Sequence, residues 1–204
     1  MKLYGSYTSP FVRKCRVAAI ELGLKDAIAF EETAVKPTMP NVDYGSGVNP
    51  VRRVPALATE DAGVLADSAL IVEYLDAKAG GGQLIPATGA DRFRALNRAA
   101  IASGATDALV LAMYEGALRP QTYQWTEWRV DQMDKAHAAI VWFEVEMDPV
   151  EGAFDVGAIA LGCFLGYADF RFGNIDWLAA APRLKAWWTE TQKRPSFEQT
   201  APPQ

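Results

Sequence analysis

The sequence predicts an α/β domain in its first part and an all-helical domain in the remainder. Three observations support this expectation. Short segments with strand and helix spacing alternate up to residue 79, in the order βαβ and then ββα. A run of three glycines at 80–82 interrupts that pattern, and from residue 91 onward the strand signals stop. We therefore expect domains at 1–79 and 91–204, joined by a linker at 80–90.

The elements of the first domain follow from local spacing and from turn residues. Residues 10–22 place Val12 and Cys15 on one apolar helical face, and Gly23 ends the helix. Proline, glycine and asparagine are frequent at 34–50, which predicts a loop with a weak helix. In order, we expect a strand at 2–5, a helix at 10–22, a strand at 27–33, a hairpin of strands at 55–59 and 64–66, and a helix at 67–78.

The second domain shows helical spacing in each of its apolar segments. The longest apolar run, 156–168, lies between Asp155 and Asp169 and is too short to cross a bilayer, so we expect a buried helix there. The expected helices are 91–118, 122–147, 155–172 and 182–193, which together indicate an all-α bundle.

Composition and charge exclude several classes of function. The 204 residues are half apolar and carry a net charge of −5, so no basic excess is present to attract nucleic acid or an anionic membrane. The N-terminal residues lack the apolar stretch of a secretory signal, which favours a cytoplasmic protein. Two cysteines, Cys15 and Cys163, make no disulfide framework, and with the single His137 they fit no zinc-ligand spacing, so we expect no metal.

The segment from Tyr7 to Val12 contains the first candidate site. Ser9 fits the N-cap of a helix, and Pro10 fits the first helical position, where its missing N–H is not needed. This arrangement leaves free backbone N–H groups and the positive end of the helix dipole beside the Ser9 hydroxyl. Such a position favours an anion, for example a thiolate. From the local sequence alone, a helix cap without a catalytic role is the alternative.

Val54-Pro55 and Asp67-Ser68 are further candidates for ligand contacts. A proline directly before a strand cannot donate to a ladder, and a cis peptide bond there would leave the Val54 N–H and C=O for a peptide-like ligand. Asp67 and Ser68 lie where a turn enters a helix, so a hydroxyl and free amides converge there. The local alternatives are a trans proline that opens an edge strand and an ordinary helix cap.

In this order, the segments resemble the cytosolic glutathione S-transferase superfamily, and the resemblance covers nearly the whole chain. It is closest to bacterial serine-type members whose N-terminus reads GSYTSPFVRK, here 5–14. It implies a thioredoxin-like N-terminal domain followed by an all-α C-terminal helical bundle. The other segments that support it are 49–50, 53–57, 67–75, 161–163, 166–171 and 194–197.

By this resemblance, Ser9 is the catalytic residue and donates a hydrogen bond to the sulfur of bound glutathione. A free thiol has a pKa near ~8.5 and is only a few per cent thiolate at pH 7, so donation from Ser9 lowers that pKa toward the reactive form. Residues 9–12 contain no cysteine, which excludes dithiol exchange at this turn. Tyr7, Tyr4 and Thr8 are the alternative contacts to the sulfur.

The resemblance also assigns residues that bind the tripeptide. Val54 pairs its backbone with the cysteinyl unit beside a cis Pro55, and Arg53 attracts the glycyl carboxylate. Asp67 and Ser68 hold the γ-glutamyl end. The full set implied to bind glutathione is Thr8, Phe11, Arg53, Val54, Pro55, Asp67 and Ser68.

The implied activity is that of a glutathione S-transferase: thiolate attack on a small hydrophobic electrophile, in detoxification, by a homodimer. The same scaffold supports glutathione-dependent peroxidases, dehalogenases and isomerases, and a non-catalytic glutathione-binding module is the alternative outside enzymes. The electrophile pocket is expected between Phe11 and one face of helix 91–118. The chain departs from the family at the start of the buried helix. The family favours Ser or Thr at the cap and Asp three residues later, whereas this chain has Asp155 and Ala158, so one hydrogen bond of the capping box is missing.

Overall fold

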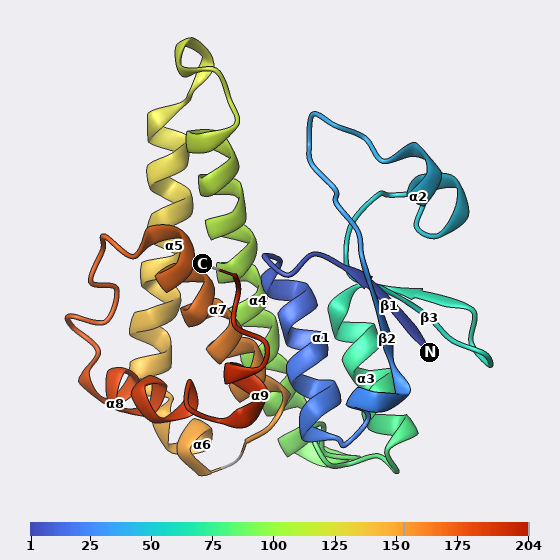
Figure 1. Ribbon diagram of the computed structural model, residues 1–204. Coiled ribbons are helices and arrows are strands. Elements are labelled where there is room, and N and C mark those ends of the chain that lie inside the picture. Colours follow the sequence, from blue (N-terminus) through green and yellow to red (C-terminus); the bar gives the residue numbers. More distant parts are fainter. Residues whose placement is uncertain (153, 204) are drawn as a thin grey trace. The chain divides into compact units, whose positions relative to one another are not determined.

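A four-stranded mixed sheet lies at the centre of the N-terminal unit of the computed structural model, which describes residues 1–152 and 154–203 (Figure 1). β1 runs parallel to β2 and antiparallel to β3, which pairs antiparallel with β4. The expected βαβ and ββα order is therefore confirmed. The strands are β1 (Lys2–Gly5), β2 (Ala29–Glu32), β3 (Ala56–Ala58) and β4 (Val64–Ala66), in the sheet order β2-β1-β3-β4.

Two helices, α1 (Pro10–Glu21) and α3 (Ser68–Lys78), pack against each other through their apolar faces. Val12 of α1 and Ile71 of α3 are fully excluded from solvent. Gly5, the last residue of β1, permits a close approach of α1, because a side-chain carbon at that position would lie 2.6 Å from a methyl group of Val12. As the parallel pairing of β1 and β2 requires, the connection between these strands passes through a helix, α1.

Two shorter helical segments complete this part of the chain. η1 (Lys25–Ala27) precedes β2, and α2 (Val42–Gly47) lies within 34–50, where the sequence predicts a weak helix. The side chain of Asn41 caps α2 by accepting a hydrogen bond from the Tyr44 N–H at 3.0 Å. The loop therefore has a fixed turn of helix directly before the Arg53 segment.

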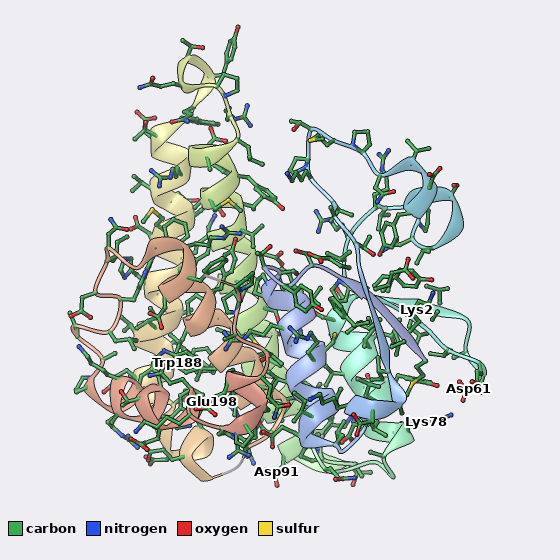
Figure 2. All side chains as sticks on the ribbon, in the orientation of Figure 1. Lys2, Asp61, Lys78, Asp91, Trp188 and Glu198 are labelled. Atoms are coloured by element: carbon green, nitrogen blue, oxygen red, sulfur yellow. The ribbon has the colours of Figure 1, made fainter. Side chains whose placement is uncertain are left out.

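The turn between β3 and β4 is tied to α3 by a polar cluster. Asp61 accepts hydrogen bonds from the Tyr74 hydroxyl at 2.5 Å and from Lys78 Nζ at 2.9 Å. The bonds from Lys78 and then from Tyr74 lower the pKa of Asp61 to about 2. Figure 2 shows Asp61 at the tip of this turn, with Lys78 on α3 below it. The hairpin is thus fixed at its exposed end as well as through the sheet.

The second unit, Phe93–Arg194, contains helices and no strand among the residues described. Its α7 helix is almost entirely buried, and the side chain of Asp155 caps it by accepting from the Gly157 and Ala158 N–H groups. No helix in the described ranges is both long and apolar enough to cross a membrane. The helices with residues in this unit are α4 (Gly89–Ala117), η2 (Gln121–Tyr123), α5 (Thr126–Val145), α6 (Met147–Gly152), α7 (Val156–Phe172) and α8 (Pro182–Thr191).

After the helical unit the chain returns to the first unit, so that residues 1–92 group with the segment from Pro195 onward. There α9 (Pro195–Glu198) packs on α1. Arg13 donates hydrogen bonds to the Phe197 carbonyl at 3.1 Å and to Thr200 Oγ1 at 3.4 Å, and its guanidinium lies 5.2 Å from the centre of the buried Phe197 ring. The domain limits expected from the sequence, 1–79 and 91–204, remain a prediction.

Candidate functional site

Three segments selected from the sequence meet at one edge of the sheet. β1, β3 and β4 are in register at Tyr4, Ala56 and Ala66. At this edge the chain leaves β1, enters β3 and leaves β4, because β3 is antiparallel to both of its neighbours. The topology therefore places the three candidate segments close together. They are 6–9, 53–55 and 67–68.

Ser9 occupies the N-cap of α1. Its backbone is extended, with φ −82° and ψ 123°, and its Oγ accepts a hydrogen bond from the Val12 N–H at 3.3 Å. Pro10 follows at the first helical position, as the sequence predicts. Within the described ranges the Ser9 hydroxyl has no acceptor, so its hydrogen can donate to a ligand at the positive end of the helix.

The alternative sulfur contacts already have neighbours of their own. The Tyr7 ring lies 4.6 Å from the ring of Phe30, centre to centre, and the Arg16 guanidinium lies 4.9 Å from the Tyr7 ring. Thr8 Oγ1 is 3.0 Å from Ser6 Oγ, and the two hydroxyls share one hydrogen bond. These contacts explain the position of the Tyr7 ring and give the Thr8 hydroxyl a partner, while the choice of Ser9 among the candidates stays a prediction.

The Tyr4 ring likewise has a packing partner, because its centre lies 6.0 Å from that of Tyr44. Phe11, the second residue of α1, is half-buried. Its position directly after Pro10 places it in the first turn of the helix that Ser9 caps.

The peptide between Val54 and Pro55 is cis. Val54 precedes the β1–β3 ladder, whose first pair joins Tyr4 and Ala56. Neither the N–H nor the C=O of Val54 forms a hydrogen bond in the part of the chain that the structure describes. Both groups are therefore free to pair with an extended peptide ligand.

The Arg53 backbone is held by two residues whose role the sequence did not reveal. Its carbonyl accepts hydrogen bonds from the Tyr44 hydroxyl and from Asn49 Nδ2, both at 2.8 Å. Burial raises the pKa of Tyr44 to about 12, so this hydroxyl stays protonated and donates. The Arg53 side chain is exposed and has no partner among the described residues. Residues 49–50 are part of the family resemblance, but the sequence did not predict that Asn49 binds the Arg53 carbonyl.

Asp67 caps α3 from an unusual backbone conformation. Its φ is 81° and its ψ 131°, a region that residues other than glycine rarely adopt. Its Oδ1 accepts a hydrogen bond from the Ala69 N–H at 2.7 Å. Ser68 follows at the first helical position and is 4% exposed. A strained cap beside free helix amides is typical of ligand-binding turns.

From the spacing of Cys15, Cys163 and His137, the sequence predicts no metal site. Among residues 1–152 and 154–203, no cluster of three or more His, Cys, Asp or Glu side chains could hold a metal ion. Cys15 and Cys163 are both buried. The polar groups at the edge are hydroxyls, backbone amides, one arginine and the Asp67 carboxylate, a set suited to an organic ligand that carries carboxylates and an amine.

Comparison with protein families gives two matches, one in each half of the chain. Residues 3–83 match the glutathione S-transferase N-terminal domain, and residues 98–188 match the glutathione S-transferase C-terminal domain. The first match contains all of the candidate residues described above.

Similar proteins cover the chain from end to end. An uncharacterized GST-like protein of Escherichia coli K12, YibF, is 32% identical, with 100% of this chain and 99% of the relative covered. A glutathione transferase family member from Pseudomonas fluorescens Pf-5, solved with bound glutathione, is 38% identical at a TM-score of 0.96, covering 100% of this chain and 99% of the other. A second structure from Pseudomonas fluorescens Pf-5, with bound S-(propanoic acid)-glutathione, is 37% identical at a TM-score of 0.91, covering 99% of each chain. Together with the two domain matches, these likenesses show that the chain belongs to the glutathione S-transferase family.

Proposed function

We propose that this protein is a glutathione transferase that binds glutathione at the shared sheet edge and activates its thiol for attack on a small hydrophobic electrophile. The observation that carries the proposal is the geometry of Ser9, whose oxygen accepts from the Val12 N–H while its hydrogen is free to donate. The bound glutathione of the Pseudomonas fluorescens relative supports the choice of co-substrate.

In this proposal the thiol loses its proton to solvent, and the Ser9 O–H donates to the thiolate. Because the hydrogen bond and the helix N-terminus stabilise the charged form, the pKa of the thiol falls. A decrease of ~2 units corresponds to roughly 2.7 kcal/mol. A sulfur lone pair then forms the S–C bond, and the leaving group departs with the electrons of the bond that breaks.

The remaining contacts would orient the tripeptide. The Val54 N–H and C=O pair with its cysteinyl unit beside Pro55, and the Arg53 guanidinium attracts the glycyl carboxylate. Asp67 and Ser68 hold the γ-glutamyl end at the start of α3. Thr8 and Phe11 complete the wall of the site. The thioether bound in the second Pseudomonas fluorescens structure is the kind of product that this chemistry forms.

A homodimer in the cytoplasm, acting in detoxification, is part of the same proposal. Light scattering coupled to size exclusion measures the dimer directly. A monomer at micromolar concentration would contradict this part and leave the thiol chemistry to be judged separately.

The ultraviolet absorbance of the thiolate tests the central claim. We expect glutathione mixed with the protein to ionise at a lower pH than free glutathione, and the shift to be lost in Ser9→Ala. The rate with an aryl halide should fall ~10²-fold or more in that variant. Ser9→Thr keeps both the cap and the hydroxyl and is expected to restore the shift.

An ionisation curve identical to that of free glutathione would indicate a binding module without activation. A normal shift in Ser9→Ala would instead assign the contact to Tyr7 or Thr8.

A further inference from the structure

A second candidate site lies within the helical unit, where α4 ends and α5 begins (Figure 1). A pocket of about 280 Å³ opens there between the two helix ends and the η2 turn. It uses none of the residues that we assign to glutathione. The residues that line it are Glu115, Arg119, Tyr123, Trp125 and Trp128.

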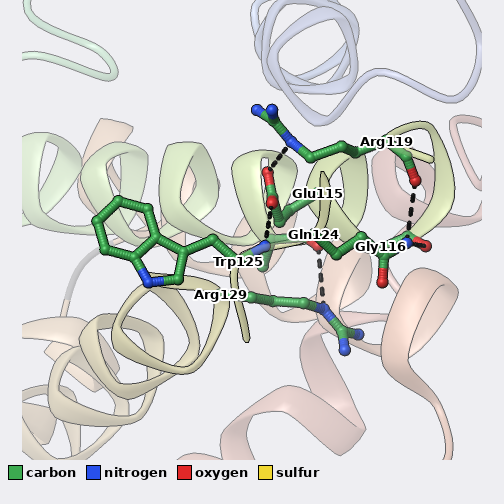
Figure 3. Close-up of polar contacts among 7 residues, drawn as sticks. Glu115, Gly116, Arg119, Gln124, Trp125 and Arg129 are labelled. Carbon is green, nitrogen blue, oxygen red and sulfur yellow. Dashed lines mark hydrogen bonds and ion pairs between the residues drawn. The ribbon is translucent and has the colours of Figure 1, made fainter. Parts of the chain in front are cut away.

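Glu115 is one of the residues that line this pocket, and Figure 3 shows its polar contacts. Its side chain is buried, and its carboxylate accepts hydrogen bonds from the Trp125 N–H and from Arg119 Nε, both at 2.7 Å. The bond from Trp125 and then the pairing with Arg119 lower the pKa of Glu115. A negative charge in the last turn of a helix opposes the helix dipole, and these two donors offset that unfavourable interaction.

The Nε of Arg119 is therefore bound to Glu115, while its two terminal nitrogens remain accessible. Its side chain is 53% exposed. Among the residues described, no acceptor contacts its two terminal nitrogens. A guanidinium that uses Nε for one carboxylate still presents a parallel pair of N–H groups, which matches the two oxygens of a second carboxylate.

The backbone around Arg119 is fixed as well. Gln124 Nε2 donates to the carbonyls of Gly116 and Arg119, both at 3.0 Å. Arg129 Nε donates to the Ala112 carbonyl at 3.2 Å and brings a second cation to the same turn. A binding group that is already positioned loses little conformational entropy when a ligand arrives.

Aromatic rings form the remaining walls. Tyr123 is 72% exposed and Trp125 62% exposed, while Trp128 is half-buried. Large rings gathered at a surface pocket beside a cation are typical of a recognition site, because they offer flat apolar area with little entropy to lose. Rings and guanidinium together select a ligand that is flat and apolar at one end and anionic at the other.

We propose that this pocket binds a small organic carboxylate with a flat aromatic or unsaturated body. The carboxylate pairs with the terminal nitrogens of Arg119, and the flat body lies against Trp125 and Trp128. A volume of about 280 Å³ limits this body to one or two rings. All the residues that line the pocket belong to the helical unit. Binding of the carboxylate can therefore be measured in the absence of glutathione.

The test uses 2-naphthoate and its neutral analogue 2-naphthalenemethanol, added to the full chain in the absence of glutathione. Indole N–H signals in ¹H–¹⁵N NMR spectra report the contact, assigned with Trp125→Phe and Trp128→Phe. We expect naphthoate to shift the signals of Trp125 and Trp128 before those of the other tryptophans, and to bind about ten-fold more tightly than the alcohol.

Arg119→Gln should raise the Kd of naphthoate about ten-fold and leave that of the alcohol unchanged. Lys185→Gln removes an exposed cation elsewhere in the same unit, 3.6 Å from Asp176, and should change neither value. Equal affinity for acid and alcohol, or shifts confined to other indoles, would overturn the proposal. The comparison of the two ligands on the unmodified protein decides the matter even if Arg119→Gln folds poorly. Neither result depends on transferase activity.

Discussion

Arg98 of α4 and Asp155, the N-cap of α7, form a buried ion pair within the helical unit. Only 8% and 10% of the two side chains are exposed. The same carboxylate accepts the Gly157 and Ala158 N–H groups at 2.8 and 3.1 Å, so one side chain both starts α7 and joins it to α4. The pair gives α7 a polar anchor where Ala158 lacks the aspartate of a capping box.

Removing one partner of this pair should destabilise the protein strongly. We expect Arg98→Ala to lower the free energy of unfolding by ~3–5 kcal/mol, because it leaves the Asp155 charge buried without a cation. Urea denaturation measures the change. Lys135→Ala, which breaks the exposed pair with Asp131, is the control and should cost less than ~1 kcal/mol. Similar losses in both variants would refute the assigned role.

Two glycines should respond to alanine in opposite ways. A methyl group at Gly157 would lie 2.7 Å from Arg98 Cβ, so Gly157→Ala should cost ~1–3 kcal/mol as α7 is displaced from α4. At Gly104, in the middle of α4, an added methyl group meets no atom within 4 Å. There alanine should stabilise by ~0.5–1 kcal/mol through helix propensity. Thermal unfolding of the two variants, measured in parallel, distinguishes close approach from propensity.

The segment after Arg194 should determine how well α1 is held. Phe197 is fully buried against Arg13, so Phe197→Ala is expected to cost ~3–5 kcal/mol and to speed amide hydrogen exchange in α1. Phe93→Ala removes a ring that is 70% exposed and serves as the matched control. Unchanged protection of residues 10–21 in Phe197→Ala would show that α1 does not depend on this contact.

The hairpin cluster predicts a pH dependence. The pKa of Asp61 is lowered from 3.8 to about 2 in the folded state, so the carboxylate stabilises the fold above about pH 4. This contribution decreases as the pH falls from about 4 to about 2, where Asp61 gains its proton in the folded chain too. We expect Asp61→Asn to be less stable than the unmodified protein at neutral pH and to lose that difference near pH 2. Denaturation curves at several pH values provide the measurement, and a constant difference would contradict it.

Much of the first unit was predictable because its signals are local. Ser9, Pro10 and Asp67 predict the starts of two helices from their residue types alone. The structure confirms Ser9 and Asp67 as N-caps and Pro10 as the first residue of α1. The order of strands and helices along the chain followed from short segments with strand or helix spacing. The pairing of the strands then brings the selected segments together at one edge of the sheet. The spacing of residues along the sequence does not predict this proximity.

Contacts between distant residues were not predictable in the same way. Arg98 and Asp155 lie 57 positions apart, and the pairing of their charges depends on how α4 and α7 cross. Glu115 looks like an ordinary helical residue in sequence, because its burial and its bond to Trp125 appear only when the η2 turn closes. The roles of Tyr44 and Asn49 behind Arg53 were missed for the same reason.

The position of α9 also affects the order of events during synthesis. About 100 residues, Phe93–Arg194, separate the first 92 residues from the Phe197 ring that covers α1. At a translation rate of roughly 5–20 residues per second, these residues alone take roughly 5–20 s to synthesise, so α1 exists for longer than that before the ring is made. A nascent chain therefore carries a first unit that is still incomplete while the helical unit is being made, and translation sets when Phe197 can cover α1.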